Sequence, residues 1–180
     1  MRVVLTSILC FLAVQTGCSQ HLTWRAVDQM IASKFPDVPT ITTDSLAQRL
    51  DASGAERPLL LDARSPEEYA VSHLPGARRV NPDSAAVPRL DTLSTETPIV
   101  VYCSVGYRSA RVASRLRERG FTNVANLKGS IFRWANEGRS VVRDGVPVRA
   151  VHPYDASWGT LLDDELHAYT PSEGSRENMD

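Results

Sequence analysis

The chain has few cysteines, no long apolar run beyond residue 20 and no surplus of charge, and each shortage excludes a class of protein. Three cysteines in 180 residues exclude a disulfide-rich scaffold. Twenty Lys and Arg residues balance 21 Asp and Glu residues, so the basic stripe of nucleic-acid-binding proteins is missing and no nucleic-acid partner is expected. No downstream segment is apolar over the length of a bilayer. The remaining composition is typical of one globular domain with a single sizeable core.

Residues 1–20 predict an export signal. Arg2 is followed by the apolar run Val3–Val14, which only Thr6 and Ser7 interrupt, and then by small or polar residues. The apolar part is too short for a stable membrane span. We therefore expect an exported protein in the periplasm or cell envelope.

Two ways of processing this signal are compatible with the residues that follow it. The tripeptide ending in Cys18 resembles the lipobox of bacterial lipoproteins, in which the cysteine is lipidated and becomes the first residue. That pattern has an aliphatic residue three positions before the cysteine, where this chain has Gln15 and places Val14 one position too early. Cleavage after Ser19 is the alternative. We favour lipidation of Cys18, which would anchor the protein to a membrane.

Processing of the signal leaves one thiol in the mature domain. Cys10 is removed with the signal, and Cys18 is either lipidated or removed, so only Cys103 remains. An unpaired cysteine in an exported protein indicates a reactive thiol or an intermolecular disulfide. A small core residue at the end of an apolar strand is the competing interpretation.

The residues around Cys103 favour a nucleophile. Ile99–Tyr102 is a short, β-rich apolar run that predicts a buried strand, and Arg108 opens an amphipathic helical pattern that Gly120 ends. The cysteine therefore lies on a short glycine-containing turn below a helix N-terminus. Unpaired backbone N–H groups there, and the fixed charge of Arg108, both favour a thiolate.

The order of predicted elements indicates the fold class. Strands and helices alternate, which predicts an α/β domain with a mostly parallel central sheet and helices on both faces. Ligands of such sheets bind beyond the carboxyl ends of the strands, where Cys103 falls. The expected strands are 58–62, 77–80, 99–102 and 123–127, and the expected helices are 22–35, 66–72, 108–120 and 130–137.

Segments outside this alternation suggest the domain limits. Residues 21–38 are expected to form an N-terminal helix, with Trp24, Val27, Met30 and Ile31 on its apolar face. The main domain is expected over 39–140. Residues 141–169 are expected to form a C-terminal appendage that begins with a hairpin around Asp144-Gly145, and residues 170–180 a disordered tail.

With these residues in view, the chain resembles a single-domain rhodanese, a member of the sulfurtransferase family. The resemblance covers roughly residues 40–140. It is carried by four motifs in the order and spacing of the family: Leu61-Asp-Ala-Arg64 with Pro66-Glu-Glu-Tyr69, His73-Leu-Pro-Gly-Ala77, the loop Cys103–Ser109, and Leu127-Lys-Gly-Ser130 with Trp134.

The resemblance implies a covalent mechanism. The thiolate of Cys103 attacks the outer sulfur of a donor such as thiosulfate and forms a persulfide, which cyanide or a thiol then discharges. Asp62 and Arg64 are implied as supporting residues, with a purely structural role as the alternative. The implied substrate-binding residues are those of the loop after the cysteine: Ser104, Val105, Gly106, Tyr107 and Arg108.

The loop also bears on substrate class. Four residues separate Cys103 from Arg108, whereas the related phosphatases and arsenate reductases are known for five, so the resemblance favours sulfur over phosphate or arsenate. Neutral Ser104 and Val105 stand where some thiosulfate-using members carry a basic residue. This difference leaves thiosulfate, a small persulfide and a partner protein's sulfur open as donors.

Other functions remain as alternatives. The same pocket could serve a non-catalytic binding or sensing module, and the appendage could recruit a partner to a structural lipoprotein. No cofactor is expected, and His21, His152 and His167 lack the spacing of metal ligands, so no metal is expected either. His73 is expected to serve the turn in which it lies rather than act as a general base.

Overall fold

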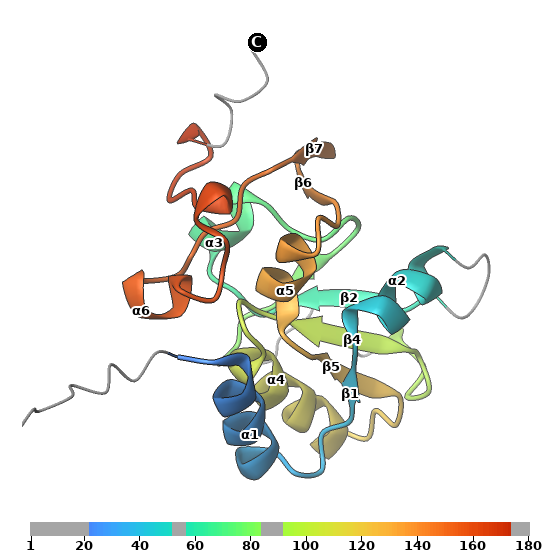
Figure 1. Cartoon of the computed structure of the whole chain (residues 1–180). Helices are drawn as coiled ribbons and strands as arrows, with labels where there is room; N and C mark the ends of the chain where they lie inside the picture. The colour runs from blue at the N-terminus through green and yellow to red at the C-terminus, as the bar shows by residue number, and fades with distance from the viewer. Residues whose placement is uncertain (1–21, 52–56, 84–91, 174–180) are drawn as a thin grey trace, which may run out of the picture.

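A computed structural model describes residues 22–51, 57–83 and 92–173 (Figure 1). The predicted export signal, with Cys18, and residues 174–180 of the expected tail lie outside these ranges. Among the described residues, no helix has the length and apolarity needed to cross a membrane.

The described residues form a five-stranded sheet in which every strand pair is parallel, as the alternation of elements predicts. The strand order is β1-β5-β4-β2-β3, so β4 occupies the centre and its carboxyl end faces the middle of one sheet edge. The strands are β1 Thr40–Ile41, β2 Leu59–Asp62, β3 Arg78–Arg79, β4 Ile99–Tyr102 and β5 Val124–Leu127.

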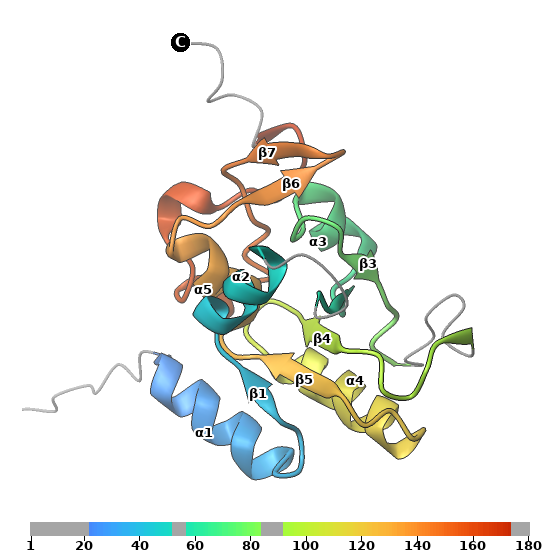
Figure 2. The same cartoon turned by 90° about the vertical axis from the view of Figure 1, so that its right-hand side faces the viewer.

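Helices cover both faces of this sheet (Figures 1 and 2). Side chains of β4 alternate between two cores, with Val100 and Tyr102 in one and Ile99 and Val101 in the other. Helices α1, α2 and α5 contribute to the first core, and α4 contributes to the second. The helices are α1 Trp24–Lys34, α2 Thr43–Asp51, α3 Pro66–Val71, α4 Tyr107–Glu118, α5 Ser130–Asn136 and α6 Ala156–Gly159.

The N-terminal helix packs through a narrower face than its sequence predicts. Val27 and Ile31 of α1 are buried, and Trp24 is partly buried. The expected inward position of Met30 is wrong, because 40% of this residue is exposed. Residues i and i+4 lie on one side of a helix, and here Val27 and Ile31 are the residues of α1 that are buried.

The start of α3 is built as its sequence predicts. Ser65 is the N-cap and its Oγ accepts a hydrogen bond from the Glu68 N–H, while Glu68 Oε2 accepts one from the Ser65 N–H at 2.9 Å. This reciprocal capping box fixes the Glu68 side chain near the helix N-terminus. The helix ends at Val71, and Leu74 and Ala77 then close a turn.

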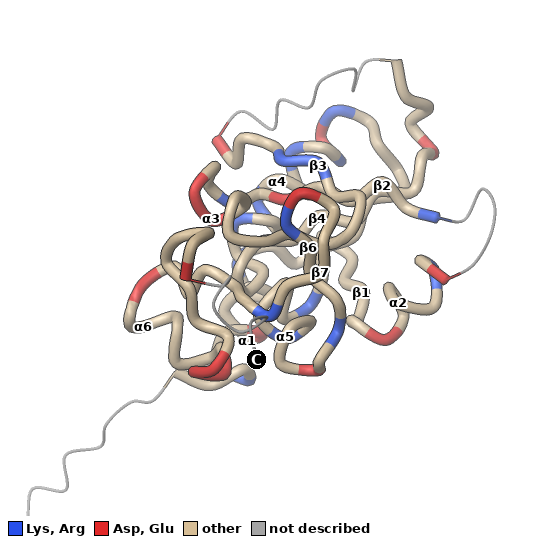
Figure 3. The backbone as a smooth tube through the Cα atoms, turned by 90° about the horizontal axis from the view of Figure 1, so that it is seen from above, with Lys and Arg blue, Asp and Glu red and all other residues tan. Residues whose placement is uncertain are grey.

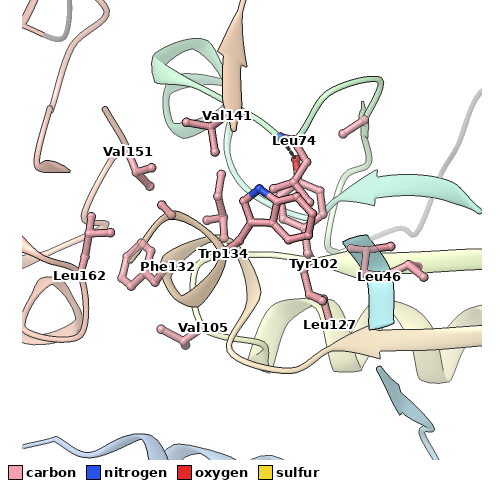
Figure 4. Packing of buried hydrophobic residues seen from close by; sticks show 14 of the residues in the cluster. Leu46, Leu74, Tyr102, Val105, Leu127, Phe132, Trp134, Val141, Val151 and Leu162 are labelled. Carbon is pink, nitrogen blue, oxygen red and sulfur yellow. Dashed lines mark hydrogen bonds between the residues drawn. The ribbon is translucent and has the colours of Figure 1, made fainter. Parts of the chain in front are cut away.

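The C-terminal segment shares the core of the main domain. Strands β6 Val141–Arg143 and β7 Val146–Val148 form the expected antiparallel hairpin, which is followed by α6 and a short 3₁₀ helix, Asp164–Leu166. Val151 and Leu162 pack near Phe132 of α5 (Figure 4). The segment is therefore part of the folding unit.

We expect Leu162→Ala to lower the free energy of unfolding by about 2–4 kcal/mol, because it leaves a cavity in the main core. Val146→Ala in the hairpin is the control, since Val146 is 60% exposed and its truncation is expected to cost less than about 0.5 kcal/mol. Urea unfolding measures both. Equal costs for the two variants would show that residues 151–166 do not contribute to the core.

Candidate active site

Cys103 lies directly after β4, at the carboxyl end of the central strand. Its side chain is buried, and the residue is 1% exposed. Its Sγ accepts a hydrogen bond from the Gly106 N–H at 3.1 Å and one from the Ser109 hydroxyl at 3.4 Å. Both donors come from the loop and first turn that lead into α4, so the helix start surrounds the sulfur with N–H and O–H groups.

These contacts favour the thiolate. Burial alone raises the pKa of Cys103, but the charge of Arg108 and the hydrogen bonds from Ser109 and Gly106 outweigh it, and the pKa lies below its ordinary value. A thiol with a lowered pKa is more fully ionised at neutral pH and is the better nucleophile.

Two neighbouring segments hold the loop in this shape. The Cys103 N–H donates to Ser130 Oγ at 3.1 Å, and the Cys103 carbonyl accepts from the Ile131 N–H at 3.1 Å. The Asn126 Nδ2 donates to the Gly106 carbonyl at 3.0 Å. Gly106 has φ +118°, which side chains disfavour, and an added Cβ would meet Ile31 Cδ1 at 3.1 Å. Hydrogen bonds to the end of β5 and the start of α5 therefore fix the conformation of the loop.

Glu68 is the buried partner of Arg108. The two guanidinium Nη atoms donate to the two carboxylate oxygens at 2.7 Å each, and the Ser104 hydroxyl donates to Glu68 Oε1 at 2.9 Å. Burial raises the pKa of Glu68, but the hydrogen bonds and charge of Arg108 outweigh it and lower the pKa to about 2. The carboxylate that caps α3 thus also holds the loop arginine.

Asp62 and Arg64 form a second, fully buried ion pair. Arg64 Nη2 contacts Asp62 Oδ2 at 2.7 Å and donates to the Ser72 carbonyl at 2.6 Å. The guanidinium also lies 5.8 Å from the centre of the Tyr102 ring, one residue before Cys103. The pair therefore joins the end of β2 to the turn after α3 and lies beside Tyr102 at the end of β4.

His73 serves the turn in which it lies. Its backbone pairs with Val142 of the hairpin, and its ring stacks on Tyr69 at 3.9 Å between centroids. Among the described residues, no group of His, Cys, Asp and Glu side chains could hold a metal ion. Lys and Arg are scattered among Asp and Glu along the backbone rather than gathered in a stripe (Figure 3).

A small pocket opens above the cysteine, and residues far along the chain complete it. Its volume is about 120 Å³. Tyr154 and Trp158 come from the C-terminal segment, and the Tyr154 ring lies 4.7 Å from the Arg108 guanidinium carbon. The lining residues are Cys103, Ser104, Val105, Tyr107, Arg108, Tyr154 and Trp158.

The pocket brings the predicted loop residues together and adds several that the sequence analysis missed. Ser104, Val105, Tyr107 and Arg108 line it, and Gly106 turns its N–H toward the sulfur. Glu68 lies within the motif Pro66-Glu-Glu-Tyr69, and nothing in its spacing indicates that its partner Arg108 is 40 residues away. The other residues missed are Ser109, Asn126, Ser130, Tyr154 and Trp158.

We expect Glu68→Gln to lower the free energy of unfolding by about 2–3 kcal/mol at neutral pH, because Arg108 keeps its charge and loses its buried partner. The folded-state pKa of Glu68 lies below the ordinary 4.5, so its contribution is present above pH 4.5 and is lost as the pH falls toward about 2. Urea unfolding across this range should show the two proteins converge. A difference that stays constant with pH would contradict the role of the pair.

We also expect Arg108→Ala to raise the pKa of Cys103, since the cation that favours the thiolate is removed. The ultraviolet absorbance of the thiolate, followed as a function of pH, measures this shift without requiring a reagent to enter the pocket. Arg111→Ala is the control, because Arg111 lies one turn along the same helix and pairs with Asp83 instead. An unchanged titration in Arg108→Ala would show that the charge of Arg108 does not lower the pKa of Cys103.

Comparison with known proteins places this geometry in a family. The rhodanese-like domain matches residues 42–137. A sulfurtransferase of Allochromatium vinosum is 34% identical over 105 residues, which is 58% of this chain and 95% of the relative. The thiosulfate sulfurtransferase GlpE of Pseudomonas paraeruginosa is 29% identical over 113 residues, covering 63% of this chain and 86% of that one.

Solved structures agree with this assignment. The rhodanese-like domain protein of Staphylococcus aureus superposes with a TM-score of 0.51 at 27% identity, over 59% of this chain and 99% of that one. A thiosulfate sulfurtransferase from Pseudomonas aeruginosa shares the fold, with a TM-score of 0.55 at 21% identity over 67% of this chain and 23% of the other. With a buried cysteine at the carboxyl end of its central parallel strand, the chain belongs to the rhodanese-like domain family.

Proposed function

We propose that the protein is a sulfurtransferase that carries sulfane sulfur as a persulfide on Cys103. The observation that supports this most directly is the environment of Sγ, which receives the Gly106 N–H and the Ser109 O–H beside the charge of Arg108. A site of this kind stabilises a thiolate before the reaction and an anionic sulfur after it.

The reaction runs in two displacements. The Cys103 thiolate attacks the outer sulfur of the donor, the donor's sulfur bond breaks, and its electron pair leaves with the remainder of the donor, which is sulfite when the donor is thiosulfate. The acceptor then attacks the outer sulfur of the persulfide. Cyanide leaves as thiocyanate, a thiol leaves as a persulfide, and the Cys103 thiolate is restored.

The loop residues have separate tasks in this proposal. The Gly106 N–H holds charge on the cysteine sulfur, while Ser104 and Val105 line the space for the incoming sulfur. Arg108 supplies positive charge from a position that Glu68 fixes. Asp62 and Arg64 act as positioning residues, because their ion pair braces the end of the strand that carries the cysteine.

A non-catalytic binding or sensing module is the second candidate. Its support is the deep burial of Cys103 beneath a small pocket, since a module that only recognises a ligand would not need an accessible sulfur. The four-residue loop between Cys103 and Arg108 argues against a phosphatase or arsenate reductase, in which a longer loop surrounds a tetrahedral oxyanion.

We further propose that the protein works outside the cytoplasm, in the periplasm or cell envelope. The apolar run in residues 1–20 supports export, and Cys18 supports attachment to a membrane by a lipid. Metabolic labelling with a fatty acid in a bacterial host tests this. Label that is lost in Cys18→Ser supports the anchor, whereas an unlabelled, exported protein would favour cleavage after Ser19.

We expect Cys103→Ser to abolish thiocyanate formation from a sulfane-sulfur donor and cyanide, because a serine hydroxyl cannot carry the persulfide at neutral pH. Intact mass after exposure to the donor should rise by one sulfur atom in the wild type and not in the variant. Circular dichroism of Cys103→Ser checks that the fold is kept.

The two candidate functions give different results in this experiment. Activity in the wild type with none in the variant supports sulfur transfer through Cys103. Absence of both turnover and added sulfur in a folded wild type, with every donor tried, would favour the binding module.

A further inference from the structure

The pocket above Cys103 is walled by aromatic side chains and offers little free charge. Tyr107, Tyr154 and Trp158 line it together with Val105, and Arg108 is its one charged residue within the described ranges. Both Nη atoms of that arginine already contact the Glu68 carboxylate, and the Tyr154 ring lies over the guanidinium. The positive charge of the pocket is therefore largely balanced before any substrate arrives.

The other charged and titratable groups near the pocket do not add a net positive charge to it. Asp62 and Arg64 neutralise each other in the core. Burial lowers the pKa of the neighbouring His152 below its ordinary value and so disfavours its charged form. With Cys103 as thiolate, the charges of Arg108 and Glu68 cancel and the thiolate leaves one negative charge among these three groups, which opposes the entry of an inorganic dianion such as thiosulfate.

Tyr154 and Trp158, which form the aromatic wall of the pocket, are held in place by local hydrogen bonds. Tyr154 has φ +70°, a conformation that non-glycine residues seldom adopt, and its N–H donates to His152 Nδ1 at 3.0 Å. Asp155 caps α6 by accepting from the N–H groups of Ser157 and Trp158 at 2.9 Å. Strain of this kind persists only where the surrounding structure imposes it and is common at ligand sites.

Further contacts tie this wall to the domain. Asn136 of α5 donates to the Leu161 carbonyl at 3.0 Å, and its Oδ1 accepts from the Asp163 N–H at 3.1 Å. The His167 Nε2 lies 3.2 Å from the Gly159 carbonyl. These bonds hold the C-terminal end of α6 and the turn after it against the domain, and thereby fix the helix that carries Trp158.

We propose that Tyr154 and Trp158 make the site select a small organic sulfur compound, with a carbon group on its sulfur and at most one negative charge. This inference rests on the proposed sulfur transfer and deepens it. The carbon group of this compound would pack against the two rings, while the outer sulfur of the compound would contact Cys103 Sγ. A pocket of about 120 Å³ is well below the roughly 300–1,000 Å³ of sites for drug-sized ligands, so a small molecule fits it better than a protein loop.

The test compares donors that deliver the same sulfur. Benzenethiosulfonate and methanethiosulfonate are organic monoanions, whereas thiosulfate is an inorganic dianion, and all three leave the same persulfide for cyanide to discharge. With an organic thiosulfonate, the thiolate takes the outer sulfur and the leaving group is the sulfinate. We expect kcat/KM for benzenethiosulfonate to exceed that for thiosulfate by about tenfold or more, the size of effect that one apolar contact gives.

Variants then assign the preference to the two rings. Tyr154→Ala and Trp158→Ala should each lower the ratio of the two kcat/KM values by about threefold or more, since each removes part of the apolar wall. Tyr154→Phe keeps the ring and should keep the ratio. Trp24→Ala is the matched control, because Trp24 packs on Arg133 away from this pocket.

The outcomes separate this inference from the proposed function. A wild type that prefers thiosulfate, or a ratio that both alanine variants leave unchanged, would overturn the inference while sulfur transfer stands. A folded protein that takes sulfur from none of the donors would overturn the proposed function as well. A ratio that falls in the alanine variants and survives in Tyr154→Phe supports selection by the rings.

Discussion

The partly buried ion pair between Glu68 and Arg108 is the constraint that joins the loop after Cys103 to the start of α3. One carboxylate caps α3, accepts a hydrogen bond from the Ser104 hydroxyl and binds both Nη atoms of Arg108, so a helix start and the loop after Cys103, about 40 residues apart, share one anchor. Removing water from such a pair is costly, and only several simultaneous hydrogen bonds make it favourable. This contact ties the first turn of α4 to the start of α3 and holds the cation that lowers the pKa of Cys103.

Features set by neighbouring residues could be predicted from the sequence. The capping box at Ser65, the buried strand Ile99–Tyr102 and the turn at Gly106 each reflect local preferences, and the alternation of strands and helices was enough to predict a parallel sheet. The position of Cys103 at the carboxyl end of a buried strand followed from that alternation.

Features set by distant residues could not be predicted in the same way. The partner of Arg108, the hydrogen bond from Asn126 to the loop and the ring of Tyr154 all join segments that only the folded chain brings together. Met30 shows the converse error, since its helical spacing predicted burial but the described residues leave 40% of it exposed. The helical spacing of apolar residues indicates which side of a helix faces the core, but it does not give the width of the face that the rest of the protein covers.

The order in which the chain is made has a consequence for the C-terminal segment. Tyr154 and Trp158 follow every strand of the sheet in the chain, yet they line the pocket, and Leu161 and Leu162 beside them belong to the main core. A chain interrupted near residue 150 would carry the cysteine, the loop and the arginine, but it would lack part of its core and the outer wall of its pocket. Loss of this segment would therefore lower the stability of the fold and increase the exposure of the Cys103 thiol at the same time.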